Sequence, residues 1–205
     1  MSDQAETLKA TKPTLTIINM VLLAQSHNPS ILTPDWFKDH CNIQEKVENF
    51  LCTPELSVLK TEELQIVCDN NRFQILPTKQ SAITRTVDIV KRYVSTLSHI
   101  PLTALGFNFT WNAPKSCDIA IEVNKRHLPG QLNSMELSYG AIIYGKSEDW
   151  KMKLAVETGD ANEQVFNFNF HFDLKDKTDK LGEFIESFQS QLISSEKIVT
   201  SIFLS

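Results

Sequence analysis

Two segments of the chain alternate aromatic and polar residues with a period of two. Residues 107–111 read FNFTW, and residues 165–173 read VFNFNFHFD. Because successive side chains of a β-strand point to opposite faces, each segment predicts a strand with one aromatic and one polar face. The aromatic positions are Phe107, Phe109, Trp111, Phe166, Phe168, Phe170 and Phe172. A wall of seven rings has to be covered, which favours a sheet with helices packed on one side.

Two other segments have the spacing of amphipathic helices that can cover this wall. Residues 81–98 and residues 178–193 each carry an apolar stripe whose members step by three and four. The stripes consist of Ile83, Val87, Val90, Val94 and Leu97, and of Leu181, Phe184, Ile185, Phe188 and Leu192. A short helical region is also predicted near the N-terminus, because Thr33 and Pro34 are typical of an N-cap and a first helical position. Apolar residues continue from there to Leu51 at roughly helical spacing, and Asn42 can divide the run into two helices.

Short apolar segments predict the remaining strands. They are residues 15–24, 56–59, 64–68 and 73–76, with a tight turn at Asp69-Asn70-Asn71. The fold class predicted is therefore α+β, with a mainly antiparallel sheet, two long amphipathic helices on one face and a short N-terminal helical region.

The domain organisation predicted is a polar N-terminal tail, residues 1–13, followed by a single domain, residues 14–205. In this domain the same order of elements occurs twice. Predicted strands precede the helix at 81–98, and further predicted strands precede the helix at 178–193. A duplication would explain the repeated order, so the domain can consist of two related halves, about 14–98 and 102–195.

Residues 140–147, GAIIYGKS, match the pattern of a phosphate-binding loop at Gly140, Gly145, Lys146 and Ser147. Such a loop needs a strand before it and a helix directly after it, so that the helix N-terminus faces the anion. Here the variable positions are β-branched or aromatic, which favours a strand, and WKMKLAVE after the motif alternates like a second strand. We therefore interpret the match as a chance feature of a β-hairpin with its turn at residues 145–149.

Composition and charge limit the classes of partner. The formal net charge is −5, so the chain as a whole does not attract nucleic acid or an anionic membrane. The longest apolar stretch, residues 15–24, is about half of what a membrane span needs. The N-terminal segment lacks the pattern of a signal peptide, and a cytoplasmic location is expected.

The four cysteines form no recognised metal-ligand spacing, and no other metal or cofactor motif is present in the sequence. They are Cys41, Cys52, Cys68 and Cys117. Because free cysteine is often buried, we expect reduced, buried thiols. We also expect no cofactor and no metal.

Three segments of the chain resemble a group of uncharacterised bacterial proteins of similar size. They are TPDWFKD near the N-terminus, and NRFQI and TALGFNFTW on either side of the helix at 81–98. The resemblance covers about the middle third of the chain. It implies a bacterial or phage-related origin, and it carries over no active-site residue and no function.

No catalytic constellation is present in the sequence, so an enzyme is not favoured. The outward positions of the two aromatic strands suggest a contact surface instead, because uncharged amides can be desolvated against a partner without burying an ion. The candidate residues are Asn108, Thr110, Asn112, Asn167, Asn169 and His171. The alternative for such a row is the solvated face of an antiparallel sheet.

The function predicted is a non-catalytic protein-interaction or scaffolding subunit that acts through its sheet surface or edges. Its partner is another protein or a second copy of the chain in a homo-oligomer. An alternative is a binding module for a small apolar ligand held between the aromatic strands and the helices. A P-loop-type nucleotide binder is the third candidate.

Overall fold

A computed structural model describes residues 12–114, 140–159 and 163–203. In these residues a nine-stranded antiparallel sheet has the order β2-β3-β4-β5-β1-β6-β9-β8-β7. The strands are β1 (Thr14–Ala24), β2 (Val47–Cys52), β3 (Leu56–Thr61), β4 (Leu64–Asp69), β5 (Arg72–Pro77), β6 (Leu102–Pro114), β7 (Ala141–Lys146), β8 (Lys151–Thr158) and β9 (Glu163–Asp173). The α+β fold class and the antiparallel sheet predicted from the sequence are confirmed.

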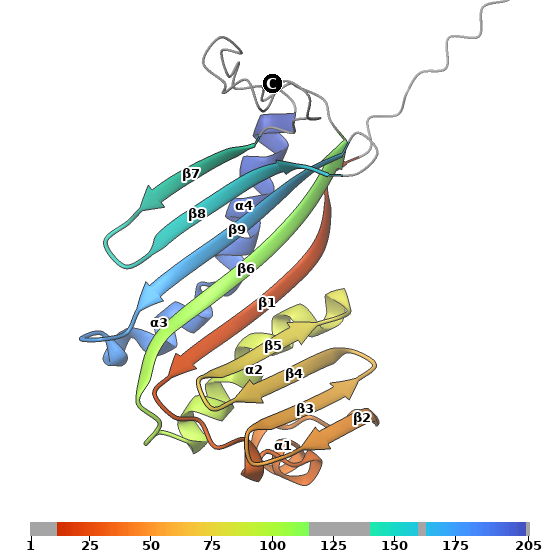
Figure 1. Ribbon diagram of the computed structural model, residues 1–205, viewed down its shortest axis with the longest axis vertical. Coiled ribbons are helices and arrows are strands. Elements are labelled where there is room, and N and C mark those ends of the chain that lie inside the picture. Colours follow the sequence, from red (N-terminus) through yellow and green to blue (C-terminus); the bar gives the residue numbers. More distant parts are fainter. Residues whose placement is uncertain (1–11, 115–139, 160–162, 204–205) are drawn as a thin grey trace, which may run out of the picture.

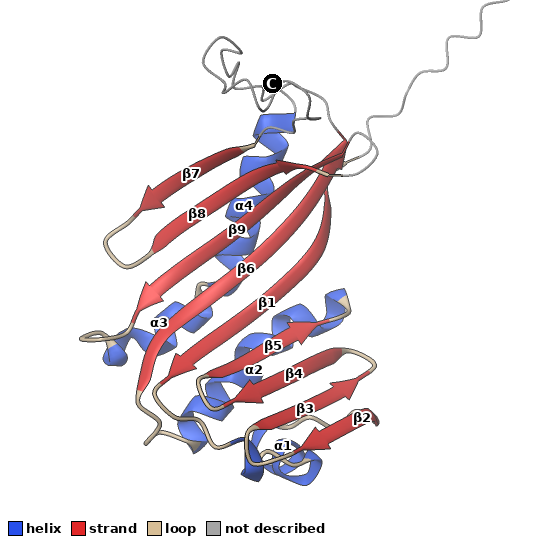
Figure 2. Cartoon of the chain, viewed as in Figure 1, coloured by secondary structure: helices blue, strands red, loops and turns tan. Residues whose placement is uncertain are grey.

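The helices lie on one side of the sheet, and Figures 1 and 2 view the sheet from the opposite side, which we call the open face. They are α1 (Pro34–Cys41), α2 (Gln80–Thr96), α3 (Leu181–Glu186) and α4 (Phe188–Phe203), with short 3₁₀ turns η1 (Pro29–Ile31) and η4 (Thr178–Lys180). Helix α2 lies behind β5, and α4 lies behind β6 and β9. The covered side of the sheet and the helices share one hydrophobic core.

The aromatic wall lies in that core, as the alternation predicts. Phe107, Phe109 and Trp111 pair with Phe170, Phe168 and Phe166 across β6 and β9. These six side chains and Phe172 are all 5% exposed or less. The ring of Phe188 at the start of α4 closes over them, with its centroid 5.0 Å from that of Phe107 and 5.5 Å from that of Phe109.

The helical region predicted from Thr33 to Leu51 is shorter in the structure. Helix α1 ends at Cys41, because Asn42 has a left-handed backbone (φ 55°, ψ 41°) that stops the helix. Residues 47–52, whose apolar spacing suggested a helix, instead form β2 and pair with β3. A short apolar run fits either period, and pairing with a neighbouring strand decides between them here.

The predicted helix at 178–193 is also corrected. It begins as the turn η4 and the short helix α3, whose C-cap is Ser187, and α4 then continues ten residues beyond the predicted end, to Phe203. The four predicted strands in residues 15–76 and the turn at Asp69-Asn70-Asn71 agree with β1, β3, β4 and β5. The sheet continues from β1 to β6 through ten residue pairs, with register shifts between Leu15 and Ile17 and between Leu23 and Ala24. The division into two related halves stays a prediction, and residues 1–11 of the predicted tail lie outside the described residues.

Candidate functional site on the open face of the sheet

All six residues predicted as a contact surface lie on the open face of β6 and β9. They alternate with the buried aromatic residues and are half-buried or exposed. Asn108 pairs directly with Asn169, and Thr110 pairs with Asn167, while Asn112 and His171 lie farther along the two strands. The structure therefore brings the six residues together on one surface, and their contact role stays a prediction.

The amides on this surface are hydrogen-bonded across strands. Asn169 Nδ2 donates to Asn108 Oδ1, and Asn108 Nδ2 donates to Asn19 Oδ1, each over 2.7 Å. Thr110 Oγ1 donates to Asn167 Oδ1 over 2.9 Å. We call Asn19, Asn108 and Asn169 the amide row. Each amide has two N–H groups and two acceptor lone pairs, so the row retains hydrogen-bonding capacity towards a partner.

Asn19 belongs to this row although the sequence analysis did not select it. It is the one strongly polar side chain inside the apolar run LTIINMVLLA, and it is only 6% exposed. Its position opposite Asn108 depends on the register of β1 with β6, which connects residues 89 positions apart. A lone Asn within an apolar strand was the available signal, because a buried amide requires a hydrogen-bond partner.

Apolar and uncharged residues flank the amide row. A second row crosses the sheet through Val58, Val67, Gln74, Val21 and Gly106, as the pairings of β3, β4, β5, β1 and β6 show. On β1, Ile17 lies beside the amide row and is 49% exposed, and Leu23 lies beside the second row and is 37% exposed. The centre of the open face thus combines apolar side chains with uncharged amides, and charged residues border it directly, because Lys153 pairs with Asn169 and Arg72 pairs with Leu23.

The segment that matches a phosphate-binding loop lies in a hairpin. Residues Ala141 to Lys146 are the strand β7, and the next element is the strand β8, where a phosphate loop requires a helix. Gly140 precedes β7, Gly145 lies within it, and Lys146 is exposed at its end. The preceding residues 135–139 read MELSY, which predicts that the strand begins before Gly140, and they lie outside the described residues.

Lys146 and Ser147 border a surface pocket of about 250 Å³ near the end of β9, which also includes Trp150, His171 and Lys177. Asp149, in the hairpin turn, accepts hydrogen bonds from Lys177 over 2.8 Å and from Lys180 over 3.3 Å. These lysines hold the pKa of Asp149 below its usual value, mainly through the hydrogen bond from Lys177. The contacts fasten the hairpin to the segment after β9.

A buried polar cluster lies at the other end of the sheet. His27 Nδ1 is 2.8 Å from the Tyr93 hydroxyl, and Tyr93 stacks on Phe73 with ring centroids 3.8 Å apart. Burial lowers the pKa of His27, so the ring is neutral at pH 7. Burial raises the pKa of the neighbouring Cys68 thiol to about 12, as it does for Cys41, so both remain thiols and are poor nucleophiles.

Cys41, Cys52 and Cys68 are free thiols, and Cys41 and Cys68 are buried, as predicted. Cys52 is half-buried, and Cys117 lies outside the described residues. Within the described part of the chain, no group of three or more His, Cys, Asp or Glu side chains is arranged to hold a metal ion. Among the same residues, no helix is both long enough and apolar enough to cross a membrane.

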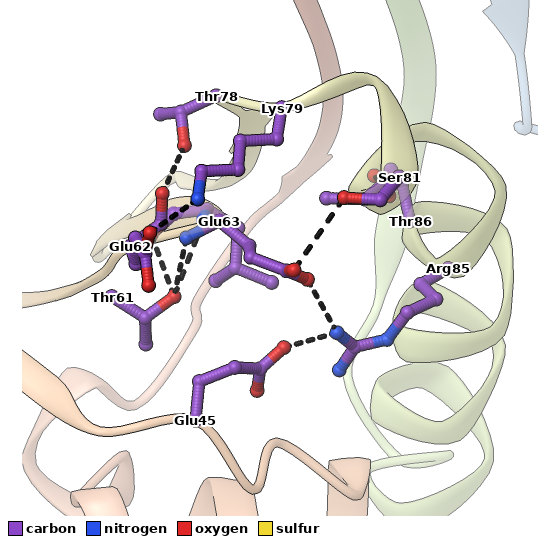
Figure 3. A network of polar contacts seen from close by, with 11 residues as sticks. Glu45, Thr61, Glu62, Glu63, Thr78, Lys79, Ser81, Arg85 and Thr86 are labelled. Carbon is purple, nitrogen blue, oxygen red and sulfur yellow. Dashed lines mark hydrogen bonds and ion pairs between the residues drawn. The ribbon is translucent and has the colours of Figure 1, made fainter.

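Arg85 on α2 connects two glutamates from separate loops (Figure 3). Its Nη1 donates to Glu63, over 2.9 Å, and also to Glu45. Burial alone would raise the pKa of Glu45, but the hydrogen bond and charge of Arg85, helped by backbone contacts, hold it below the usual value. Lys79 forms an ion pair with Glu62 close by. This network attaches the segment before β2 and the β3–β4 turn to α2, which is a structural role.

The open face gathers all six residues that the sequence predicted as a contact surface. Searches with models of protein families and among curated proteins find no match to the chain.

Proposed function

We propose that the protein is a non-catalytic interaction subunit that binds another protein through the open face of its sheet. The observation that carries the proposal is the uncharged centre of this face, where the amide row adjoins half-exposed apolar residues of β1. Binding on the amides and on the apolar side chains of β1 loses little on desolvation, because none of these groups is an ion that has to be buried. The hydrogen-bonding capacity that remains on the amides gives orientation to a bound partner.

The sheet also provides a rigid platform for binding. The side chains behind β6 and β9 form the aromatic wall and are packed against α4. Because such cores resist deformation, the open face keeps its shape when a partner binds. Interfaces formed by preorganised surfaces avoid part of the entropic cost of association.

Site-specific photo-crosslinking in the native host tests the proposal. A photoreactive amino acid is placed at Gln74 or Asn169 on the open face and, as a control, at the exposed Glu196 on α4. We expect both open-face positions to form an adduct with the same protein, and the control position to form none with it. The variant Val67→Glu, which places a charge in the uncharged row, should abolish the adduct while leaving the far-UV circular dichroism unchanged. Adducts that form equally from Glu196, or from no position, would refute the proposal.

A cavity supports a second candidate function, the binding of a small apolar ligand. Its volume is about 600 Å³, within the usual range of ligand sites, and it lies between the end of α2, the start of β6 and α3. Its apolar lining includes Val94, Leu97, Ile100, Leu102, Leu174 and Leu181, and polar residues such as Ser98 and Asp176 also line it. We expect an uncharged fluorescent probe such as N-phenylnaphthylamine to bind there. Leu102→Trp should abolish this binding and Ile193→Trp on α4 should preserve it, and equal binding by both variants would exclude this cavity.

A further inference from the structure

The two edges of the described sheet differ in how they are protected. At one edge, β2 contains a register shift between Val47 and Asn49, and its Glu48 forms an ion pair with Lys60. Bulges and charges of this kind prevent an edge strand from pairing with another chain. At the other edge, β7 pairs with β8 over six consecutive residues without a shift, and its only charged residue is Lys146 at the end.

The side chains of β7 are apolar and exposed on both sides of the sheet. Ile142 and Tyr144 are 57% and 75% exposed, and they lie on the open face opposite Ala155 and Lys153. Ile143 lies on the covered side opposite Leu154, which is 1% exposed, yet Ile143 is itself 47% exposed. Among the described residues, the helices therefore bury β8 and leave β7 uncovered, which makes β7 a hydrophobic edge of the described sheet.

The sequence of β7 is complementary to itself in one antiparallel register. If a second β7 pairs about a two-fold axis at Ile143, then Ile143 faces its own copy on the covered side. On the open face Ile142 faces Tyr144 of the other copy, and aromatic and β-branched side chains are favourable cross-strand pairs. Lys146 then faces Gly140, which has no side chain, so the only charge of the strand meets no like charge.

Neighbouring registers lack this complementarity. Moving the axis to Tyr144 places Ile142 opposite Lys146, and moving it to Ile142 places Tyr144 opposite Gly140. We propose that β7 is a dimerisation edge at which a second copy of this chain pairs antiparallel about Ile143, which joins the two sheets into one. Dimers with a two-fold axis are the commonest oligomers, and their interface requires a self-complementary surface of this kind.

The dimer forms through the β7 edge and the proposed partner binds the open face. The chain can therefore be monomeric and still bind a partner through its open face. A six-residue strand is short compared with a standard interface, which buries about 800 Å² on each partner. We therefore expect a reversible dimer that dissociates on dilution.

Sedimentation velocity over a concentration series provides the first test. The average mass of the wild type should rise from the monomer value of 23.3 kDa to twice that value. Ile143→Lys places like charges opposite each other on the axis and should remain monomeric at every concentration. The control Leu51→Lys, at a 50% exposed position on β2, should dimerise like the wild type. A wild type that stays monomeric, or a dimer that Ile143→Lys leaves intact, would overturn the proposal.

A distance measurement tests the register without altering the centre of the strand. Lys146→Cys is spin-labelled in a chain in which Cys52 and Cys117 are replaced by serine. With the axis at Ile143, the two labelled residues lie six residues apart along the strand direction, or about 20 Å at 3.4 Å per residue. An axis at Tyr144 gives about 14 Å and an axis at Ile142 about 27 Å, and either distance would contradict the proposed pairing.

Discussion

At the scale of single residues, the amide row gives a physical reason for Asn in the middle of long strands. Asn has a poor propensity for strands, but Asn19, Asn108 and Asn169 satisfy one another across three neighbouring strands. The register also becomes specific, because a shift by one residue would place these amides against the apolar core. A row of this kind contributes to folding, and the proposed binding would use only the hydrogen-bonding capacity that the row retains.

His27 leads to a prediction at the same scale. Burial lowers its folded-state pKa. A backbone hydrogen bond with Leu22 and the charge of Asp69 raise this pKa, but to a smaller extent. Above the ordinary pKa of about 6.5, His27 is neutral in both the folded and the unfolded chain and does not make stability depend on pH. Below it, the unfolded chain binds the proton more readily, so the free energy of unfolding falls as the pH falls.

Urea unfolding at pH 7.5 and pH 5.5 checks this prediction. We expect His27→Gln to lose less stability between the two pH values than the wild type does. The control His99→Gln, at an exposed position, should show the pH dependence of the wild type. If His27→Gln and the wild type lose the same stability, protonation of His27 is not coupled to folding.

At the scale of elements, α4 and the strands β6 and β9 depend on one another. The Phe188 ring covers Phe107 and Phe109, and Trp111 Nε1 donates to Ser195 Oγ on α4 over 2.9 Å. Ser195 Oγ in turn donates to the Leu192 carbonyl within the helix. The buried indole N–H is thus satisfied by the helix, which fixes the position of α4 along the strands.

Truncation of the aromatic wall should be costly. Phe170 is 1% exposed and contacts the rings of Phe109 and Trp150, with centroids 5.9 and 5.5 Å away. We expect Phe170→Ala to lower the free energy of unfolding by about 3–5 kcal/mol, because it leaves a cavity in a packed core. Ile142→Ala on the exposed edge strand should change it by less than about 0.5 kcal/mol. Denaturant titrations that give similar values for both variants would contradict this packing.

At the scale of the whole molecule, β1 and β6 join the two sides of the sheet. They pair along most of their length, and the covered side of all the central strands belongs to one core. Separate unfolding of one side would expose the backbone and the apolar side chains at this junction. The continuity therefore favours one cooperative transition.

Tryptophan fluorescence can follow the two sides separately. Trp36 reports on α1, next to the β2–β5 side, and Trp150 reports on the β7–β8 side. In single-tryptophan variants that both carry Trp111→Phe, we expect the two reporters to give the same urea midpoint and the same slope. Midpoints that differ reproducibly would show that the two sides unfold as separate units.

The sequence by itself determined the features that depend on neighbouring residues. The period-two alternation around Phe107–Trp111 and Phe166–Phe172 predicted two strands and the face that each of them buries. The three-and-four spacing from Ile83 to Leu97 predicted α2, and the β-branched residues of GAIIYGKS predicted a strand. In each case the side chains report the local backbone period directly, whatever partner the segment later finds.

Only the tertiary structure decided which segments became partners. Residues 47–52 fit a helix or a strand by spacing, and pairing with β3 made them β2. Asn19 joined the amide row through a register with β6 that no local pattern encodes. The strand order likewise placed β2 and β7 at the two edges of the described sheet. Contacts between residues far apart in the chain settle these points, because pairing and burial depend on which surfaces meet in space rather than on the spacing within one segment.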